Sequence, residues 1–331
     1  MKKIICLLIL FTCLVNAALA QRTTAADIIA EGIKLHDKGD YEGAILQYKK
    51  ALLLNVKETH AIYEMASSYF ALKDYKKAIE YSNMAIASGS DYANQAYIIK
   101  GSAQDLSGKP LDAVKTYREG IGKYPKDHLL HYNLALTSFN LKKYKDADEA
   151  LMKALQLSPA HASSHLLLGY SMSLQGKRVK TILALGNFLL LEPSGTRSLA
   201  ALELLEQKFK PETGKSQSVS DSDDFNTAEL MLPLLESSNK AEANKDKSAN
   251  ELFAGNMKSL FTILGELKEA NKGFWWDYYV DFFYTMVTKD HTEAFSYYIL
   301  QSNKDNLVYT WLEENKEKFN AFSNWYTAYK R

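Results

Sequence analysis

The sequence predicts an all-α protein in which helical hairpins stack into an α-solenoid, followed by a C-terminal α-helical module. Proline recurs every 34 residues, at Pro125, Pro159 and Pro193. Small residues recur with the same period, as at Ala44 and Ala78, and the apolar spacing stays helical from residue 225 onward. Such a period is typical of repeats that bury their apolar faces only against neighbouring repeats.

The N-terminus has the three parts of a secretory signal. Met1-Lys2-Lys3 is followed by an apolar run at 4–15 and by Ala18-Leu19-Ala20 before Gln21. This order predicts a signal peptide over 1–20, cleaved between Ala20 and Gln21. No later segment approaches the roughly 20 apolar residues that a spanning helix needs, so we expect no transmembrane segment after signal removal. The form of the signal favours export to a bacterial periplasm or cell envelope.

Cysteines and charge limit the other possibilities. Cys6 and Cys13 are the only cysteines and both lie within the signal, so the mature chain would carry no thiol. In an alternative interpretation Cys13 would be the first residue of a lipoprotein, but the residues before it match the small-residue motif poorly. Removing Lys2 and Lys3 takes the 40 Lys and Arg residues to 38, against 39 Asp and Glu. This balance does not favour nucleic acid as a partner.

The clearest repeat is AADIIAEGIKLHDKGDYEGAILQYKKALLLNVKE, residues 25–58. It has a small residue at Gly32, a turn at Gly39-Asp40-Tyr41, and Ala44 followed four residues later by Tyr48. Further copies are expected at about 59–93, 94–127, 128–161 and 162–195. This pattern resembles the tetratricopeptide repeat (TPR) family, and the resemblance implies five helix-turn-helix units over 25–193.

The repeat has a physical basis in close helix packing. One position of the first helix is always small, and its members are Gly32, Ala66, Gly101, Ala135 and Gly169. Proline at the end of a unit stops the second helix. The fifth unit departs from the pattern with Arg178 and with Thr181 in place of alanine, which predicts looser packing in that unit.

The remaining chain divides into a cap, a linker and a module. Residues 194–210 are expected to form a capping helix, because leucines at helical spacing alternate with charged residues there. Residues 211–224 lack periodicity and are rich in Ser and Asp, so we expect a linker. The module, 225–331, should contain helices near 225–237, 249–270, 274–288, 291–303 and 305–328, with a loop at 237–248. An alternative interpretation makes 275–308 a divergent hairpin of the same repeat.

Candidate binding residues follow from the resemblance, because ligands of this family usually lie on the concave face lined by the first helices. The positions that correspond to this peptide-binding groove are Tyr63, Phe70, Gln95, Asp105, Tyr132, Phe139, Asn140 and Tyr170. Such an aromatic groove suits an extended or helical peptide. A clamp for a terminal carboxylate is not expected, since Ile29, Ile33 and Tyr63 stand where the family would need Lys, Arg or Asn.

Two further groups of residues invite other interpretations. His128, His131, His161 and His165 lie at the starts of first helices and could be metal ligands, although half-buried structural histidines explain them as well. Asp277 and Asp281 share one stripe of the aromatic segment 273–287 and could serve a glycan-processing site, or simply form its solvated face. We expect no catalytic residues, no metal and no cofactor.

The sequence therefore favours a non-enzymatic scaffold of the periplasm or cell envelope that binds a protein or peptide partner in the concave groove. The alternative is a glycan-binding or glycan-processing protein that uses the tryptophans and tyrosines of the C-terminal module. The sequence leaves the oligomeric state open.

Overall fold

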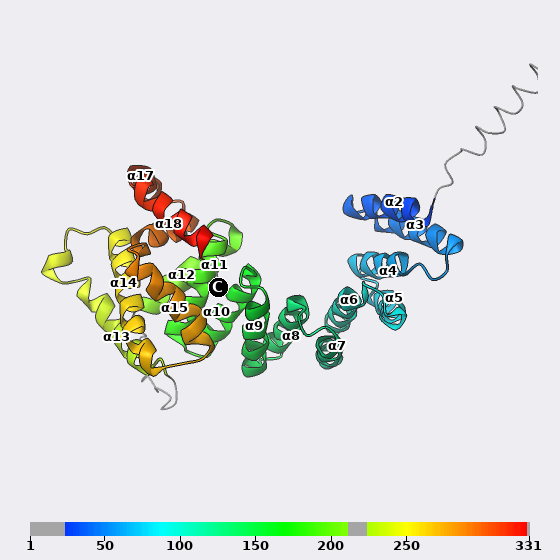
Figure 1. Ribbon diagram of the computed structural model, residues 1–331, viewed down its shortest axis with the longest axis horizontal. Coiled ribbons are helices and arrows are strands. Elements are labelled where there is room, and N and C mark those ends of the chain that lie inside the picture. The colour runs from blue at the N-terminus through cyan, green and yellow to red at the C-terminus, as the bar shows by residue number, and fades with distance from the viewer. Residues whose placement is uncertain (1–23, 211–223, 330–331) are drawn as a thin grey trace, which may run out of the picture. The chain divides into compact units, whose positions relative to one another are not determined.

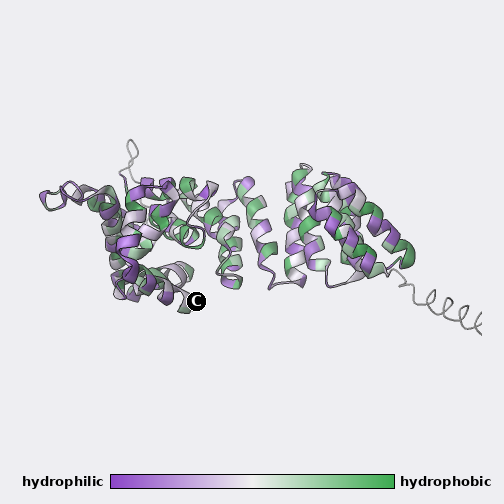
Figure 2. Cartoon of the chain, turned by 90° about the horizontal axis from the view of Figure 1, so that it is seen from above, coloured by the Kyte–Doolittle hydropathy of each residue, from purple (hydrophilic) through white to green (hydrophobic). Residues whose placement is uncertain are grey.

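The computed structural model describes residues 24–210 and 224–329, and the regular structure in these ranges is helical (Figure 1). The chain divides into two compact units, Met1–Asn133 (unit 1) and Leu134–Arg331 (unit 2), and each is described here by itself. Most described helices carry both hydrophilic and hydrophobic residues, as expected of helices with one buried face (Figure 2). The fold is an all-α solenoid of helix pairs, as the sequence predicts.

The described helices are arranged as successive pairs. Those of the five repeats are α2 (Ala25–Asp37), α3 (Tyr41–Leu54), α4 (Thr59–Ala71), α5 (Tyr75–Ser88), α6 (Ala93–Leu106), α7 (Pro110–Lys123), α8 (His128–Asn140), α9 (Tyr144–Leu157), α10 (Ala162–Leu174) and α11 (Arg178–Leu191). The helices that follow are α12 (Thr196–Phe209), α13 (Asn226–Ser238), α14 (Ala249–Leu267), α15 (Asp281–Thr288), α16 (Thr292–Leu300), α17 (Asn306–Glu314) and α18 (Lys316–Ala328). The unit boundary falls within α8.

The turn inside each repeat follows from local backbone chemistry. In the first two repeats an aspartate caps the second helix, since the Asp40 carboxylate accepts from the Gly43 N–H at 2.9 Å and the Asp74 carboxylate from the Lys77 N–H at 3.1 Å. The residue two positions before the second helix has a left-handed backbone in all five described repeats; these residues are Gly39, Lys73, Gly108, Lys142 and Gly176. Glycine suits this position because it has no Cβ, whereas lysine is strained there.

Close packing within repeats depends on the small residue of the first helix. A Cβ added to Gly32 would lie 2.3 Å from the Tyr48 ring, and one added to Gly101 would lie 2.4 Å from the Tyr117 ring. Both tyrosines are buried. The glycines therefore make room for a large ring from the second helix, and this pairing joins the two helices of the hairpin.

The fifth repeat is the most deeply buried one in the described chain. Twelve of the fourteen residues of α11 are buried, including Thr181 and Arg178. The Thr181 hydroxyl donates to the carbonyl of Lys177 at 2.7 Å, and the Arg178 guanidinium donates to the carbonyl of Lys210 at 3.0 Å. The prediction of looser packing in this repeat is wrong, because the residues after the repeats cover it.

The helices after the repeats pack around α11 and α12 within unit 2 (Figure 1). The Glu229 carboxylate of α13 accepts from the Val179 N–H at 2.8 Å, and the Ser302 hydroxyl donates to the carbonyl of Pro193 at 2.8 Å. At the centre of the module the Phe261 ring of α14 stacks on that of Phe283 at 4.3 Å. The module thus shares one apolar core with the last repeat.

The module's helix boundaries follow the predicted ones with two differences. The segment expected as one helix over 274–288 begins as a π-helical turn, Trp275–Val280, and continues as α15. The segment expected over 305–328 is two helices, α17 and α18, which meet at Asn315. The polar tract 237–248 contains a single short 3₁₀ turn, Glu242–Asn244.

Several predictions fall on residues outside the described ranges. These are the signal peptide with its cleavage site at Ala20 and Gln21, and nearly all of the linker at 211–224. The predicted domain boundaries, and the hairpin interpretation of 275–308, stay predictions. None of the helices in the described ranges is long and apolar enough to cross a membrane.

Candidate functional site on the first-helix face

The most distinctive cluster on a first-helix face lies in unit 1, between the second and third repeats. The rings of His60 and Tyr92 stack at 4.5 Å and 8°, and those of Tyr63 and Tyr92 at 5.2 Å and 14°. All three side chains are half-buried, so each keeps part of its surface exposed. We call His60, Tyr63 and Tyr92 the ring stack. It offers a flat aromatic surface at the edge of two neighbouring repeats.

A carboxylate lies beside the ring stack. Glu64 Oε1 lies 3.2 Å from His60 Nε2, one helical turn away on α4. Burial raises the pKa of Glu64, and the nearby His60 imidazole acts in the opposite direction. Burial also raises the pKa of Tyr63, and the neighbouring Glu64 charge adds to this. Near neutral pH the phenols therefore stay neutral, and a cation that approaches the rings would also meet this carboxylate.

Gln95, one turn after Tyr92, adds a polar group to the same region. The residue is half-buried, and its carboxamide oxygen is buried without a hydrogen-bond partner among the described residues. A buried acceptor of this kind costs free energy, on the order of 1–3 kcal/mol. Because this oxygen has almost no exposed surface, the Gln95 side chain would have to turn before a ligand could donate to it.

The structure places the eight predicted groove residues on both units. Tyr63, Phe70, Gln95, Asp105 and Tyr132 lie in unit 1, and Phe139, Asn140 and Tyr170 lie in unit 2. Asn140 is exposed and the other seven are half-buried.

Two of the aromatic residues pack against the second helix of their own repeat. The Phe70 ring contacts Tyr75 at 5.9 Å, and the Phe139 ring contacts Tyr144 at 5.6 Å. Part of the surface of each ring is therefore used for packing inside its own hairpin.

Tyr92 was missed by the sequence analysis. It is the residue just before α6, whereas the groove positions were taken from within the first helices. Its ring nevertheless stacks on those of both His60 and Tyr63. The only signal for Tyr92 in the sequence is that it is an aromatic residue next to the start of a helix. The 34-residue period does not mark this position in the other repeats.

Two of the four histidines considered as metal ligands serve the repeat junctions. His131 Nε2 lies 3.2 Å from the carbonyl oxygen of Pro125, and His165 Nε2 lies 2.9 Å from that of Pro159. Both pairs are six residues apart, and the pairs are related by the 34-residue period.

Another histidine has a local partner. His161 Nδ1 lies 2.7 Å from the Ser164 hydroxyl oxygen, and His128 is half-buried at the start of α8. No group of three or more His, Cys, Asp or Glu side chains within 24–210 and 224–329 is arranged to hold a metal ion.

The aromatic segment of the C-terminal module forms a core in unit 2. The Trp276 side chain is 1% exposed and stacks on Phe225 at 4.4 Å, and Tyr279 is fully buried. His165 Nδ1 lies 2.7 Å from the Tyr279 hydroxyl oxygen. Because the Pro159 carbonyl can only accept, Nε2 of the neutral His165 ring carries the proton, and Nδ1 accepts from Tyr279. This hydrogen bond ties the module to the fifth repeat.

The two aspartates of this segment have separate structural partners. The Asp277 carboxylate accepts from the Gly273 N–H at 3.1 Å and so ties the π-helical turn to the residues before it. Asp281 forms an ion pair with Lys268, and its second oxygen accepts from the Tyr329 hydroxyl at 3.3 Å. These contacts match the solvated-face interpretation better than a pair of carboxylates aimed at one sugar.

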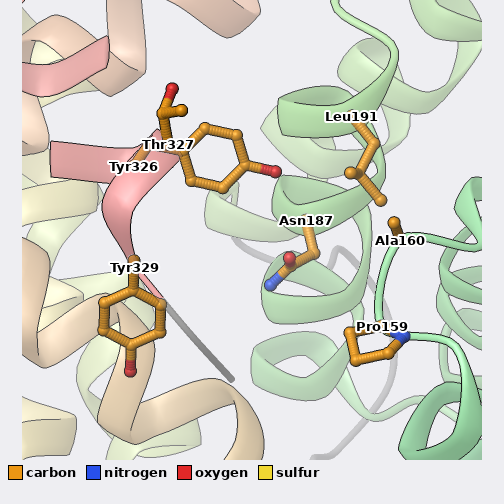
Figure 3. A pocket seen from close by; sticks show the side chains of 7 residues that line it. All are labelled: Pro159, Ala160, Asn187, Leu191, Tyr326, Thr327 and Tyr329. Carbon is orange, nitrogen blue, oxygen red and sulfur yellow. The ribbon is translucent and has the colours of Figure 1, made fainter. Parts of the chain in front are cut away.

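Unit 2 also contains a cavity of about 420 Å³ between α18, α11 and the loop before α10 (Figure 3). Its lining residues are Pro159, Ala160, Asn187, Leu191, Tyr326, Thr327 and Tyr329. Tyr326 points toward Asn187 across the cavity, and none of the lining side chains is charged (Figure 3). Its volume lies in the range of small-molecule sites.

The stacked hairpins, with a small residue packed against a ring in the first and third repeats, define a helical repeat scaffold. Comparisons with known proteins agree. Residues 29–93 and 129–161 match sequence profiles described as tetratricopeptide repeat. The chain is a tetratricopeptide repeat protein. Repeats of this family generally bind protein partners.

Known relatives share only part of their length with this chain. The TPR repeat-containing protein MJ1428 of Methanocaldococcus jannaschii is 27% identical over 44% of this chain and 27% of its own length. Small glutamine-rich tetratricopeptide repeat-containing protein 2 of Saccharomyces cerevisiae is 32% identical over 30% of this chain and 28% of its own length. The chain thus spans little more than a quarter of these relatives.

Solved structures match this chain at low sequence identity. The chain resembles pilF of Pseudomonas aeruginosa with a TM-score of 0.48 and 20% identity, over 56% of this chain and 88% of that one. This similarity concerns the fold alone.

Proposed function

We propose that the protein is a non-enzymatic interaction scaffold of the cell envelope that holds a peptide segment of a partner protein on the first-helix face of its repeats. The observation that carries the proposal is the ring stack, because three half-buried rings and a carboxylate meet at one junction between repeats. Stacked tyrosines supply contact area at low entropic cost, as in many protein interfaces.

The chemistry of this face favours a segment with a basic side chain. An Arg or Lys side chain over the Tyr63 or Tyr92 ring gains a cation–π attraction, and Glu64 can pair with its charge. Binding then consists of docking onto a surface whose rings are already stacked, which reduces the ordering cost.

The proposed location rests on the N-terminal sequence. The charged start, the short apolar run and Ala18-Leu19-Ala20 form a signal that directs the chain out of the cytoplasm. Export is tested by N-terminal sequencing of the protein recovered from the periplasmic and membrane fractions. A chain that begins at Gln21 supports the proposal, whereas an intact Met1 in the cytoplasm contradicts it.

Partner binding is tested by affinity capture from envelope extracts with the wild type and with a Tyr63→Ala, Tyr132→Ala, Tyr170→Ala variant. Tyr309→Ala serves as the matched control, because Tyr309 is 43% exposed and lies on α17, outside the repeats. We expect proteins that the wild type and the control capture and that the triple variant loses. If all three proteins capture the same partners, the first-helix face is not the binding surface.

Circular dichroism separates loss of binding from loss of folding. The three replaced tyrosines are half-buried, so the triple variant is compared with the wild type in helix content before capture. Glu64→Gln provides a milder variant, which keeps the side-chain volume and removes the charge. Its binding to a captured partner should weaken if a basic side chain occupies the site.

A further inference from the structure

The carboxylate beside the ring stack is paired with a histidine rather than with a permanent cation. His60 Nε2 lies 3.2 Å from Glu64 Oε1, and the two side chains are 31% and 16% exposed. Glu64 is thus largely shielded from water, where an unpaired carboxylate is costly. No Lys or Arg side chain in the described ranges forms an ion pair with it. The negative charge of Glu64 is therefore balanced only while a neighbouring histidine is protonated.

The groups that act on Glu64 come from several helices of unit 1. Burial has the largest effect on the pKa of Glu64 and raises it, His60 and His36 lower this pKa, and Asp37 raises it. The phenols that the Glu64 charge reaches are those of Tyr48 on α3, Tyr63 on α4 and Tyr92, and the acidic residues Asp91 and Glu58 also act on Tyr92. Both groups beside Glu64 that can carry a positive charge are thus histidines.

His60 is the histidine in direct contact with the carboxylate. Its ring stacks on that of Tyr92 at 4.5 Å and 8°, which fixes the direction of Nε2. Because an ionised carboxylate only accepts, Nε2 carries the proton of this hydrogen bond, and the imidazole gains or loses its charge at Nδ1. His36 has a different partner, since its Nδ1 lies 2.8 Å from the Ser68 hydroxyl oxygen.

The charge of this pair depends on pH in one direction. Histidine is the side chain that ordinarily changes charge between pH 5 and 8. With a neutral imidazole the pair of His60 and Glu64 is negative and attracts a cation that lies on the rings. With a protonated imidazole the pair is neutral, and the imidazolium repels an approaching Arg or Lys side chain. Protonation of Glu64 itself acts in the same direction, because it also removes negative charge.

We propose that His60 and Glu64 form a proton-operated switch, through which the ring stack binds a basic side chain at neutral pH and releases it as the pH falls toward 5. The inference rests on the proposed function and adds how binding at that site is regulated. The bound cation and the proton on His60 oppose each other, and by linkage each weakens the binding of the other by the same factor.

NMR of protein with ¹³C-labelled histidine rings measures this linkage. The full sequence has seven histidines, and the His60→Phe variant identifies the signal of His60. The probe is the blocked tripeptide acetyl-Ala-Arg-Ala-amide, and acetyl-Ala-Gln-Ala-amide is the neutral control. A fivefold coupling would move the midpoint of the His60 titration by about 0.7 pH unit, to lower pH, when the arginine probe saturates the site.

The possible results of this titration separate the two proposals. A midpoint that moves with the arginine probe and not with the glutamine probe supports the switch. A midpoint that stays in place although the arginine probe is bound overturns the switch and leaves the proposed function standing. An arginine probe that does not bind at any pH contradicts the basic side chain of the proposed function, and the switch with it.

The second test compares the affinity of the arginine probe at about pH 5.5 and about pH 7.5. The wild type should bind it about fivefold or more weakly at the lower pH. His60→Phe keeps an aromatic ring for Tyr92 but cannot be protonated, so its ratio of affinities should be clearly smaller, and the remaining fall reports Glu64. His128→Gln, which replaces a half-buried histidine at the start of α8, should keep the wild-type ratio. Circular dichroism at both pH values checks that each protein is folded. Equal affinities of the wild type at both pH values, or an unchanged ratio in His60→Phe, would overturn the role of His60.

Discussion

Gly101 offers the sharpest test of how the repeats are packed. In Gly101→Ala the new Cβ would lie 2.4 Å from Cε1, 2.5 Å from Cζ and 2.9 Å from Cδ1 of the Tyr117 ring. The ring has no room to retreat, because Tyr117 is 1% exposed and its hydroxyl is held 2.9 Å from the Ser102 hydroxyl. The substitution therefore overpacks the hairpin of the third repeat.

Two opposing effects decide the magnitude. Alanine is favoured over glycine inside a helix by about 1 kcal/mol. Overpacking of a well-filled core typically costs about 1–3 kcal/mol, and three ring atoms at these distances place Gly101→Ala at the upper end. The net expectation is a loss of about 2 kcal/mol in the free energy of unfolding.

Urea unfolding followed by circular dichroism measures this loss. Gly122→Ala is the matched control, because Gly122 lies inside α7 and an added Cβ there meets nothing within 4 Å. The control should gain about 0.5–1 kcal/mol from helix propensity alone.

A double-mutant cycle separates the clash from any other effect. The fourth repeat holds Ala135 and Leu151 at the positions of Gly101 and Tyr117, and both are fully buried. In a Tyr117→Leu background, Gly101→Ala should therefore cease to destabilise, with a coupling energy of about 2–3 kcal/mol. A Gly101→Ala variant as stable as the wild type would refute the packing argument.

Three further outcomes follow from particular contacts. Tyr279→Phe removes the hydroxyl that donates to His165 Nδ1 and should lower the stability of unit 2 by about 1–3 kcal/mol in thermal or urea unfolding, whereas an unchanged midpoint would contradict the bridge. Burial raises the pKa of Glu64 above its ordinary 4.5, so the wild type should lose stability relative to Glu64→Gln as pH rises through that raised pKa. Urea titrations at a series of pH values measure the free energy of unfolding of both proteins. A wild type that gains stability relative to Glu64→Gln as pH rises would contradict the prediction. Lys142 has a left-handed backbone with φ 59°, so Lys142→Gly should stabilise the fourth repeat by about 0.5–1 kcal/mol, and a measured loss would contradict the strain.

Much of the architecture could be predicted because one period organises it. Small residues and prolines recur every 34 residues. The small residues recur because each repeat places one of them in its first helix, close to its second helix. The turn signal was readable for the same reason, since an aspartate followed by tyrosine caps the second helices that begin at Tyr41 and Tyr75. Helices of the module were found from their apolar spacing.

Contacts between distant segments could not be predicted from this period. The His165 bond to Tyr279 joins residues 114 positions apart, and no local pattern identifies the pair. The same limit explains the error about the fifth repeat. Thr181 departs from the repeat consensus, but its packing is decided by helices whose position the sequence alone does not reveal.

The candidate site was predictable in part. The groove positions lead to Tyr63 and Gln95, since these lie at fixed positions of the first helices. Tyr92 completes the ring stack from outside those positions, where its ring orientation depends on the backbone before α6.

Photo-cross-linking in living cells tests the central claim most directly. A photoreactive phenylalanine analogue is placed at Tyr63, in the ring stack, and separately at Lys115, whose side chain is 75% exposed on the outer face of α7. The account predicts a specific covalent adduct with a partner protein from position 63, in the envelope fraction, and none from position 115. The same adducts from both positions, or no adduct from position 63, would contradict a partner held on the first-helix face.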